Sequence, residues 1–384
     1  MTSSGGRSGN PGKFAITGFP AFAGNDNADM TGDKNLSDRI LVRDEDLHRY
    51  IRDVLVALGA KPNEAGMVAD GLVWANLRGV DGHGVSRLPR YIGIIKHGEI
   101  DTKAAPRLVH DRPATFVIDS GHGFGPVSCM QAAALAVERA KKIGVCYGIV
   151  RETTHTGAIG RYAQWIAQQN CAGLVMGCGP ALMAFHGTRV ASMATSPIAI
   201  AVPSGNGAMV LDMATSTISN GKILQARATG EPLPPGTVLT AGGEPTTDPK
   251  KAEILQPLGG PKGSGLGLMF EMLASIMAGA PIQSRALGPE NRTRHVANLA
   301  MLAIDIESFR PLADFTKDAG ALVAILKGLP RQTGFDEVTM PGERSDRTET
   351  LRRKNGIPIP AKLWAELEAI AKTYSVKMPA PGPA

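Results

Sequence analysis

Residues 115–152 read TFVIDSGHGFGPVSCMQAAALAVERAKKIGVCYGIVRE, and this stretch decides the fold class. Thr115–Asp119 predicts a strand, and the apolar spacing over Val127–Lys142 predicts an amphipathic helix. Val145–Val150 predicts a second strand. Strands that alternate with helices of this length are typical of α/β and α+β proteins. The sequence therefore predicts an α/β (mixed α+β) class.

The alternation continues toward the C-terminus. Further strands are expected at Ala172–Gly177, Ile198–Val202, Met209–Met213 and Ala297–Ile306, and further helices at Ile159–Gln169, Gly263–Ala278 and Leu312–Leu326. Ala228–Lys250 is rich in Pro, Gly and Thr and predicts a long loop. Before residue 114 the pattern is helical, with helices after Asp44 and Asn63 and a third ending near Gly98. A last amphipathic helix is expected around Leu363–Tyr374.

Composition excludes several classes of protein. Of the 384 residues, 43% are apolar and 20% are charged, which rules out a wholly disordered chain. Lys and Arg exceed Asp and Glu by 41 − 35 = 6, and no dense basic block accompanies this excess, so no nucleic-acid partner is predicted. The most basic stretch, Arg344–Lys354, is interpreted as a solvated helix face.

The cysteines and the N-terminus bear on compartment. Cys129, Cys146, Cys171 and Cys178 form no C-x-x-C pair and no zinc spacing with histidine, so no metal is predicted and a reducing compartment is indicated. The sequence shows neither a secretory h-region nor a run of about 18 apolar residues, so no membrane contact and a cytoplasmic location are expected. Residues 1–38 are expected to be a disordered extension.

A glycine loop at Gly121–Gly125 imitates a dinucleotide-binding turn. It follows a predicted strand and precedes a helix, and Glu152 ends the next strand, where a ribose-binding acid would stand. The fingerprint G-x-G-x-x-G fails, because Pro126 occupies its last glycine position. The residues alone leave a Rossmann site open as the less favoured alternative.

His83, Arg87 and Tyr91 are spaced at i, i+4 and i+8, which would place them on one face of a helix. A guanidinium binds a carboxylate through two hydrogen bonds, an imidazole exchanges protons near neutral pH, and a phenol can hold a second oxygen. A surface helix with incidental polar residues is the alternative interpretation. Pro89 suits only the first turn of such a helix.

His155 lies between a predicted strand and a predicted helix, where ligands commonly bind in open α/β sheets. The alternative is a histidine that satisfies backbone groups in a turn. Leu211–Ser216 places a carboxylate and hydroxyls after a strand. Pro261–Gly265 offers Lys262 and bare amides at a helix start, which suits phosphate. Caps and turns use the same residue types, so each segment is weak alone.

Together these segments resemble the malate/L-lactate dehydrogenase family of the second, non-Rossmann type, which includes ureidoglycolate, sulfolactate and diketogulonate enzymes and cyclic imine reductases. The similarity spans about residues 40–375. The matching stretches are Arg78–Arg87, His155–Gly160, Thr195–Ala199, Leu211–Ser216 with Gly221 and Lys222, Pro257–Gly263 and Pro341–Arg344.

The resemblance implies a fold with a mixed, largely antiparallel sheet in the nucleotide domain, 114–344, and a helical domain, 39–113, completed by 345–384. A Rossmann site at the glycine loop is then disfavoured. The resemblance implies that His83 or His155 transfers the proton, and His155 is preferred because a strand end holds it rigidly. The implied substrate contacts are Arg87, Tyr91 and His295, and the implied nucleotide contacts are Asp212, Met213, Ala214, Lys262, Gly263, Gly342, Glu343 and Arg344.

The resemblance implies an NAD- or NADP-dependent oxidoreductase that interconverts a 2-hydroxy acid and a 2-oxo acid, built as a homodimer. Reduction of a cyclic imine carboxylate is the nearest alternative, and a catalytically silent nucleotide-binding homologue is another. Two positions depart from the family pattern, Gly82 in place of a serine and Thr156 in place of an aromatic residue. Both put the identity of the substrate in doubt.

Overall fold

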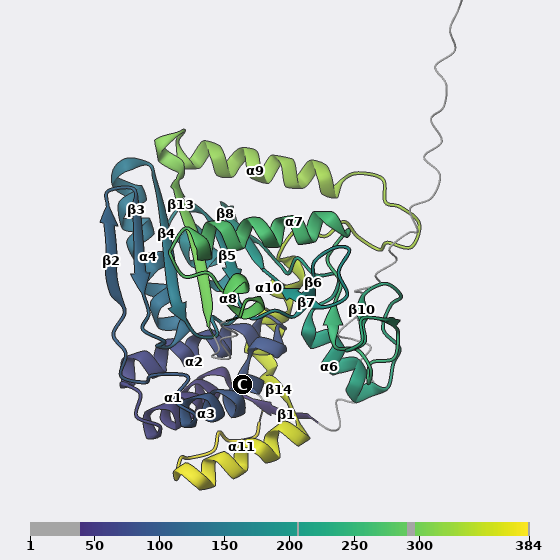
Figure 1. The fold of residues 1–384 in the computed structure, drawn as a ribbon. Coiled ribbons are helices and arrows are strands. Elements are labelled where there is room, and N and C mark those ends of the chain that lie inside the picture. Colours follow the sequence, from purple (N-terminus) through teal and green to yellow (C-terminus); the bar gives the residue numbers. More distant parts are fainter. Residues whose placement is uncertain (1–38, 206, 290–295, 383–384) are drawn as a thin grey trace, which may run out of the picture. The chain divides into compact units, whose positions relative to one another are not determined.

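The computed structural model describes residues 39–205, 207–289 and 296–382. Residues 40–384 group into one compact unit. The extension expected at 1–38 lies outside the described residues. Figure 1 shows the ribbon of this unit, with sheets and helices interleaved along the chain.

Helices are concentrated near both ends of the unit and also separate its strands. The α-helices are α1 (Asp44–Ala57), α2 (Pro62–Leu77), α3 (Leu88–Lys96), α4 (Gly125–Ile143), α5 (Gly160–Gln168), α6 (Asn220–Thr229), α7 (Pro261–Phe270), α8 (Gln283–Leu287), α9 (Leu312–Lys327), α10 (Glu343–Asn355) and α11 (Ala361–Tyr374). Short 3₁₀ turns are η2 (Asp81–His83), η3 (Val85–Arg87) and η5 (Ile306–Ser308), and η4 (Glu271–Ile276) is a π-helix that directly follows α7.

The strands form three sheets. They are β1 (Arg39–Val42), β2 (Arg107–Arg112), β3 (Thr115–Asp119), β4 (Val145–Thr153), β5 (Cys171–Cys178), β6 (Met183–Ala184), β7 (Ala191–Met193), β8 (Ile198–Ser204), β9 (Gly207–Met213), β10 (Val238–Leu239), β11 (Pro245–Thr246), β12 (Ile254–Leu255), β13 (Ala297–Asp305) and β14 (Ile357–Pro360). The main sheet has seven strands in the order β2-β3-β4-β13-β5-β8-β9.

Only β3 and β4 pair in parallel among the described neighbours of the seven-stranded sheet, and the other neighbouring pairs are antiparallel. This confirms the expectation of a mixed, largely antiparallel sheet. The order also shows why β3–α4–β4 imitates a dinucleotide fold, because these two strands and their helix form a parallel unit at one side of an otherwise antiparallel sheet.

The core consists of separate clusters of buried apolar side chains. One joins α1, α2 and α3 to α11 and contains Leu47, Tyr50 and Leu72. Another packs α4 and α5 against one face of the main sheet, and a third packs η4 against the opposite face. The division into a helical domain and a nucleotide domain stays a prediction.

Two sequence predictions were wrong in detail. The long loop expected at Ala228–Lys250 contains β10 and β11, which belong to a five-stranded sheet with β12, β6 and β7. These strands are two residues long, which is too short for an alternating pattern to reveal them. The single helix expected at Gly263–Ala278 is α7 followed by the π-turns of η4.

Candidate functional site

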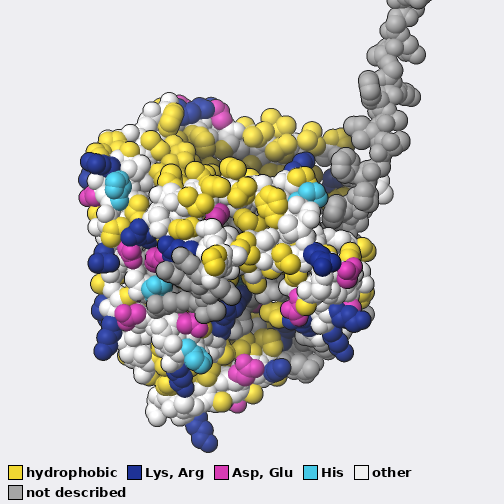
Figure 2. Space-filling view, viewed as in Figure 1, with side chains coloured by type: hydrophobic (Ala, Val, Ile, Leu, Met, Phe, Trp, Pro, Cys, Tyr) yellow, Lys and Arg dark blue, Asp and Glu magenta, His cyan; other side chains and the backbone are white. Residues whose placement is uncertain are grey.

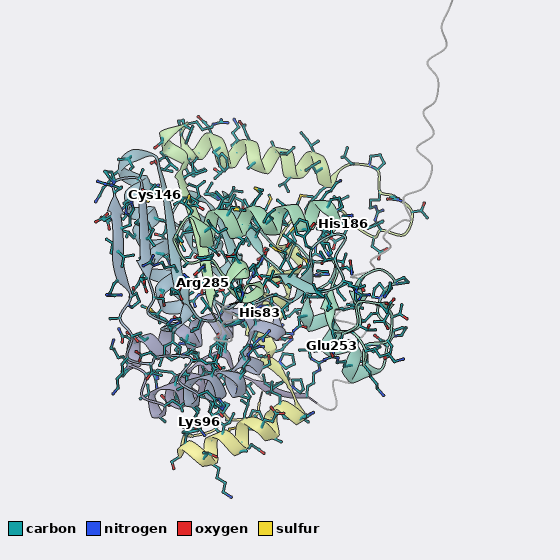
Figure 3. All side chains as sticks on the ribbon, in the orientation of Figure 1. His83, Lys96, Cys146, His186, Glu253 and Arg285 are labelled. Carbon is teal, nitrogen blue, oxygen red and sulfur yellow. The ribbon has the colours of Figure 1, made fainter. Side chains whose placement is uncertain are left out.

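A cluster of two histidines and a tyrosine forms where β4 ends. The Tyr91 hydroxyl and His155 Nδ1 are 2.7 Å apart. The His83 ring stacks on the His155 ring, with centroids 5.5 Å apart and planes inclined by 14°. Tyr91 meets His155 edge-on, at 5.7 Å. The structure therefore brings together three side chains that are up to 72 positions apart in the sequence. Figure 3 labels one of them, His83.

These residues do not share one helix, so the predicted helical face was wrong. His83 ends η2, Arg87 ends η3, and only Tyr91 lies on α3, where Pro89 occupies the first turn. The extended backbone of Gly84 separates the two 3₁₀ turns. Arg87 Nε donates to the carbonyl of Gly82 at 2.5 Å, so the side chain folds back over its own turn.

The electrostatics of the cluster favour neutral side chains. Burial lowers the pKa of His83 to about 4, and the positive charge of Arg87 adds to this effect. Burial raises the pKa of the Tyr91 phenol well above its usual value, against the lowering effect of Arg87 and Arg90. Burial lowers the pKa of the Arg87 guanidinium, and repulsion from Arg90 lowers it further. His83 is therefore uncharged at neutral pH, and Tyr91 keeps its proton.

The glycine loop before α4 supports the backbone of His155. A Cβ atom on Gly125 would lie 2.4 Å from the His155 carbonyl oxygen, so only glycine allows this approach. The Thr154 hydroxyl donates to the Gly123 carbonyl at 2.9 Å, and the Tyr162 hydroxyl donates to the Thr156 carbonyl at 2.5 Å. The glycine loop therefore packs against the segment that carries His155.

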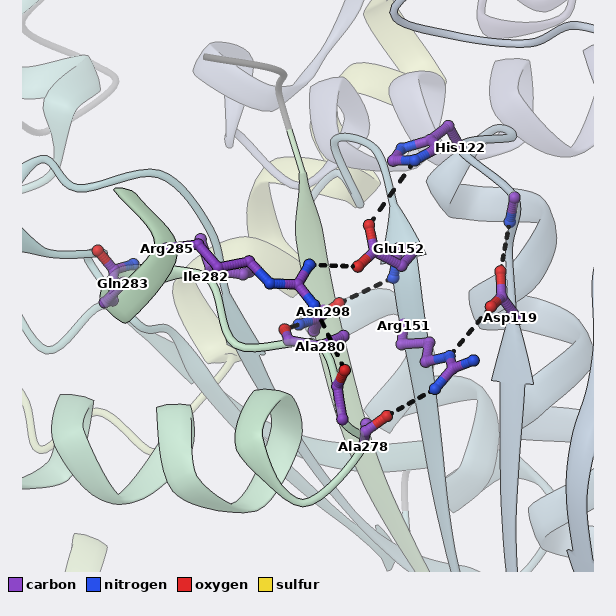
Figure 4. Close-up of polar contacts among 12 residues, drawn as sticks. Asp119, His122, Arg151, Glu152, Ala278, Ala280, Ile282, Gln283, Arg285 and Asn298 are labelled. Carbon is purple, nitrogen blue, oxygen red and sulfur yellow. Dashed lines mark hydrogen bonds and ion pairs between the residues drawn. The ribbon is translucent and has the colours of Figure 1, made fainter. Parts of the chain in front are cut away.

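Glu152 is likewise engaged within the protein (Figure 4). Its carboxylate is 2.9 Å from Arg285 Nη1 and 3.7 Å from His122 Nε2. Its amide donates to the Asn298 side chain at 2.9 Å. An acid that is committed to an arginine is a poor acceptor for ribose hydroxyls. The structure thus disfavours a Rossmann site at the glycine loop, as the family resemblance implied.

The end of β9 is a meeting point for three distant segments. The carboxylate of Asp212 accepts from the amide of Gly160, the first residue of α5, at 2.9 Å. A Cβ atom on Gly342 would lie 3.0 Å from the Val210 carbonyl oxygen. A Cβ atom on Gly263 would lie 2.4 Å from the Thr215 carbonyl oxygen. The structure thus places Gly342 and Gly263 beside β9 and the residues that follow it, and the other predicted nucleotide residues adjoin these positions in the sequence.

Two acids of this group have shifted pKa values. The Asp212 residue reaches solvent, but protein surrounds its carboxyl group, and this burial raises the pKa of Asp212 to about 6 against the lowering effects of the Gly160 amide and Arg78. Burial would also raise the pKa of Glu343, but its hydrogen bonds with Lys327 and the Met340 amide lower it overall. Glu343 opens α10 as an anion, where the helix dipole favours it.

The amides of Pro261–Gly265, expected to be bare at the start of α7, include several that have partners within the chain. The Lys262 and Gly263 amides donate to the carbonyls of Gly259 and Leu258, and the Ser264 amide donates to Gly260. This turn gives the first N–H groups of α7 partners within the chain, and a coenzyme contact at this segment stays a prediction. The Lys262 side chain is exposed, and its proposed role does not need the amides.

The remaining predictions concern His295 and metals. His295 lies outside the described residues. Within 39–205, 207–289 and 296–382, no group of three or more His, Cys, Asp or Glu side chains has metal-binding geometry. The helices of the same ranges include none that is long and apolar enough to cross a membrane.

Sequence reasoning assigned no role to three residues that support the candidate site. Asn76, in the last turn of α2, contacts the His83 turn, and Arg78, just after α2, contacts α10. Arg352 on α10 is 4% exposed rather than part of a solvated face. A polar Asn76 inside the apolar pattern of α2 was the available signal. The charge run Arg344–Lys354 gave no signal for Arg352, because the residues next to Arg352 in the sequence are exposed.

Comparison with known proteins gives a single family. The model of the malate/L-lactate dehydrogenase family matches residues 42–368. An L-sulfolactate dehydrogenase of Methanocaldococcus jannaschii is 35% identical over 342 residues, which cover 88% of this chain and 98% of the relative. A Δ¹-pyrroline-2-carboxylate reductase of Ancylobacter novellus is 30% identical, with 85% and 96% covered.

A solved structure shares the fold. The crystal structure of malate dehydrogenase from Entamoeba histolytica superposes with a TM-score of 0.85 at 29% identity and covers 89% of this chain and all of its own. The family match and the shared fold both extend over nearly the whole described unit. The chain therefore belongs to the malate/L-lactate dehydrogenase family.

Proposed function

We propose that the chain is an NAD(P)-dependent oxidoreductase that interconverts a 2-hydroxy acid and the corresponding 2-oxo acid. The observation that carries this proposal is the cluster at the end of β4, where Tyr91 holds one nitrogen of His155 while His83 covers its ring. Arg87 follows His83 by one 3₁₀ turn. A cation for a carboxylate and an oriented imidazole are the groups that such a reaction requires of the protein.

His155 is the proposed acid–base residue. The Tyr91 hydroxyl oxygen can accept from Nδ1–H, and the neutral ring then carries its lone pair on Nε2, the nitrogen proposed to meet a substrate oxygen. In oxidation, His155 takes the hydroxyl proton while the hydrogen on C2 leaves with its electron pair. In reduction, His155 returns the proton to the carbonyl oxygen. A neutral His83 cannot compete for that proton near pH 7.

Arg87 is the proposed carboxylate-binding residue. Its Nε is already bonded to Gly82, which restricts the side chain and leaves the two Nη groups for a ligand. Two parallel hydrogen bonds from a guanidinium fix both the position and the plane of a carboxylate. Tyr91 and His295 are the other proposed substrate contacts.

The residues grouped at β9 would hold the coenzyme. Asp212, Met213 and Ala214 line the strand end, and Gly342–Arg344 with Lys262 flank it. The left-handed Gly342 packs closely on the backbone of β9 at Val210, and Asp212 links this region to the loop of His155 through Gly160. The nicotinamide supplies the hydride chemistry when bound.

A cyclic imine carboxylate is the second candidate substrate. The same arginine would hold its carboxylate and the same histidine would supply a proton to nitrogen. The similarity to a Δ¹-pyrroline-2-carboxylate reductase favours its inclusion. A catalytically silent homologue would bind coenzyme without turnover.

A homodimer is part of the proposal. None of the residues of α9 is fully buried, although the helix carries Leu322 and Ile325, which are 56% and 64% exposed. On α7 and η4, the side chains of Leu266, Met269 and Leu273 are also exposed. Figure 2 shows hydrophobic side chains gathered over the α7 and α9 part of this face. Such a patch is characteristic of an interface between copies.

A cytoplasmic location belongs to the same proposal. Cys129, Cys146, Cys171 and Cys178 are all free and buried, as expected in a reducing compartment.

The direct test measures oxidation of NADH and NADPH with a panel of 2-oxo acids and cyclic imine carboxylates. We expect turnover with members of the panel and its loss in Arg87→Ala, while coenzyme fluorescence still reports binding. Coenzyme binding without turnover on every compound would support the silent homologue instead.

A further inference from the structure

Helix α10 is tied to the His83 turn by an ion pair between a buried arginine, Arg352, and a partly exposed aspartate, Asp81. Arg352, near the end of α10, is 4% exposed. Its Nη1 and Nη2 lie 2.6 and 2.9 Å from the two carboxylate oxygens of Asp81, the first residue of η2. Nη1 also donates to the carbonyl of Asn76. The pair is bidentate, so it fixes the angle of the turn as well as its distance from α10.

Asn76 completes this connection from α2. Its Nδ2 donates to Asp81 Oδ1 at 2.6 Å, and its Oδ1 accepts from the Val85 amide at 2.8 Å. A Cβ atom on Gly84 would lie 2.3 Å from the Asn76 side chain, so glycine is required where the chain passes. Asn76 thus spans η2 and η3 and holds them at one spacing.

The two functional side chains of the turn depend on this frame. The His83 ring forms no hydrogen bond with the described residues, so its place against His155 follows from the backbone of η2. Arg87 is bonded to the carbonyl of Gly82 within the same turn, and the Ser86 hydroxyl donates to the carbonyl of Asp81 at 2.7 Å. A shift of Asp81 would therefore move His83 and Arg87 together.

We propose that Asp81 and Arg352 are positioning residues for substrate, which hold the η2–η3 turn so that His83 stacks on His155 and Arg87 faces the carboxylate. This inference rests on the proposed function. Neither residue touches the ligand on this account. They act through the geometry of the turn, and an error of about 1 Å in such a position can cost about a hundredfold in rate.

A second arginine makes a separate connection to the same helix. Arg78, which follows α2, is buried and pairs with Asp346 and Glu349 of α10 at 2.6 and 3.2 Å. Its guanidinium lies near Gly342, where a Cβ atom would be 3.6 Å from Nη2. Arg78 therefore supports the coenzyme side of α10, whereas Arg352 supports the substrate side.

The test compares Arg352→Lys and Asp81→Asn with Arg353→Lys. Arg353 is the next residue on α10 and pairs with Asp44 and Glu349, away from the His83 turn. A lysine cannot reproduce the bidentate geometry. We expect KM for the 2-oxo acid to rise about tenfold or more in both test variants, with the Kd for NADH within about twofold of the wild-type value. Arg353→Lys should leave both constants unchanged.

Hydrogen exchange of the amides between residues 79 and 88 is the independent measurement. Faster exchange is expected there in Arg352→Lys and Asp81→Asn, and not in Arg353→Lys. If the wild type turns over no compound of the panel, the proposed function fails, yet the exchange comparison still tests the frame. Unchanged KM in folded variants would overturn the inference. Loss of folding in both test variants would also overturn it, because the pair would then be a general structural requirement.

Discussion

The pH dependence of catalysis separates the roles of His83 and His155. A group with a pKa of about 4 is protonated in about one molecule in a thousand at pH 7 and about one in a hundred at pH 6. His83 therefore has almost no proton to exchange where an ordinary histidine is half-titrated. Any titration of kcat between pH 6 and 8 has to come from another group, and His155 is the histidine that Tyr91 orients.

The perturbation is His155→Ala beside His83→Ala. We expect His155→Ala to lower kcat by about 10²–10⁴-fold and to abolish the near-neutral titration, as is usual for the loss of a positioned acid–base group. His83→Ala removes a stacked neutral ring and should act more on KM, with the titration kept. The assay is steady-state NADH oxidation from pH 5 to 9, with coenzyme fluorescence to show that both variants bind. Retention of the titration in His155→Ala and its loss in His83→Ala would refute the assignment.

Four further outcomes are expected. Arg87→Lys should lower kcat/KM by the equivalent of about 2–3 kcal/mol, because a lysine cannot form the bidentate charged hydrogen bonds of a guanidinium with a carboxylate. Unchanged kinetics on every substrate would remove Arg87 from the site. Gly125→Ala should lower both Tm and kcat, measured by calorimetry and turnover, because its Cβ would lie 2.4 Å from the His155 carbonyl oxygen; an unaffected enzyme would disprove the support role. Met269→Glu, at a side chain that is 52% exposed, should convert a dimer to monomers in light scattering, and an unchanged mass would move the interface elsewhere. The unfolded state binds a proton at His83 near pH 6.5 and the folded state only near pH 4, so stability is present above pH 6.5 and is lost as pH falls. Between pH 7 and 4, the free energy of unfolding of His83→Asn, measured by urea titration, should therefore fall by about 2–3 kcal/mol less than that of the wild type. Equal decreases would contradict the low pKa of His83.

The regular elements could be predicted where the helix or strand is long. The strands β3, β5 and β13 and helices such as α4 and α9 lie within a few residues of the expected bounds, because each carries several turns or alternations of apolar residues. The small sheet of β10–β12 could not be found this way. Its two-residue strands are held by pairing with β6, which is distant in sequence.

The proximity of the candidate residues could be predicted in part, but their geometry could not. The i, i+4 spacing singled out His83, Arg87 and Tyr91, and His83 and Tyr91 do meet at His155, yet the helix that justified the choice starts only after Arg87. Gly84 and Asn76 explain the difference, because the side-chain amide replaces helical hydrogen bonds and shapes two 3₁₀ turns. Such a contact between side chain and backbone has no periodic signature in the sequence.

The ion pair of Glu152 and Arg285 has a consequence for redesign of the coenzyme preference. In Rossmann enzymes the acid at the end of the second strand is the customary target when a preference for NAD is to be changed to NADP. Here the acid in that place, Glu152, is bound to Arg285. It follows the one pair of parallel strands described in the main sheet, β3 and β4. The His155 backbone packs directly against Gly125 of the glycine loop. On the proposed placement of the coenzyme, mutations copied from Rossmann engineering would loosen the loop that carries His155 and would not reach the ribose. Libraries would then belong at the end of β9 and the start of α10, around Asp212 and Gly342.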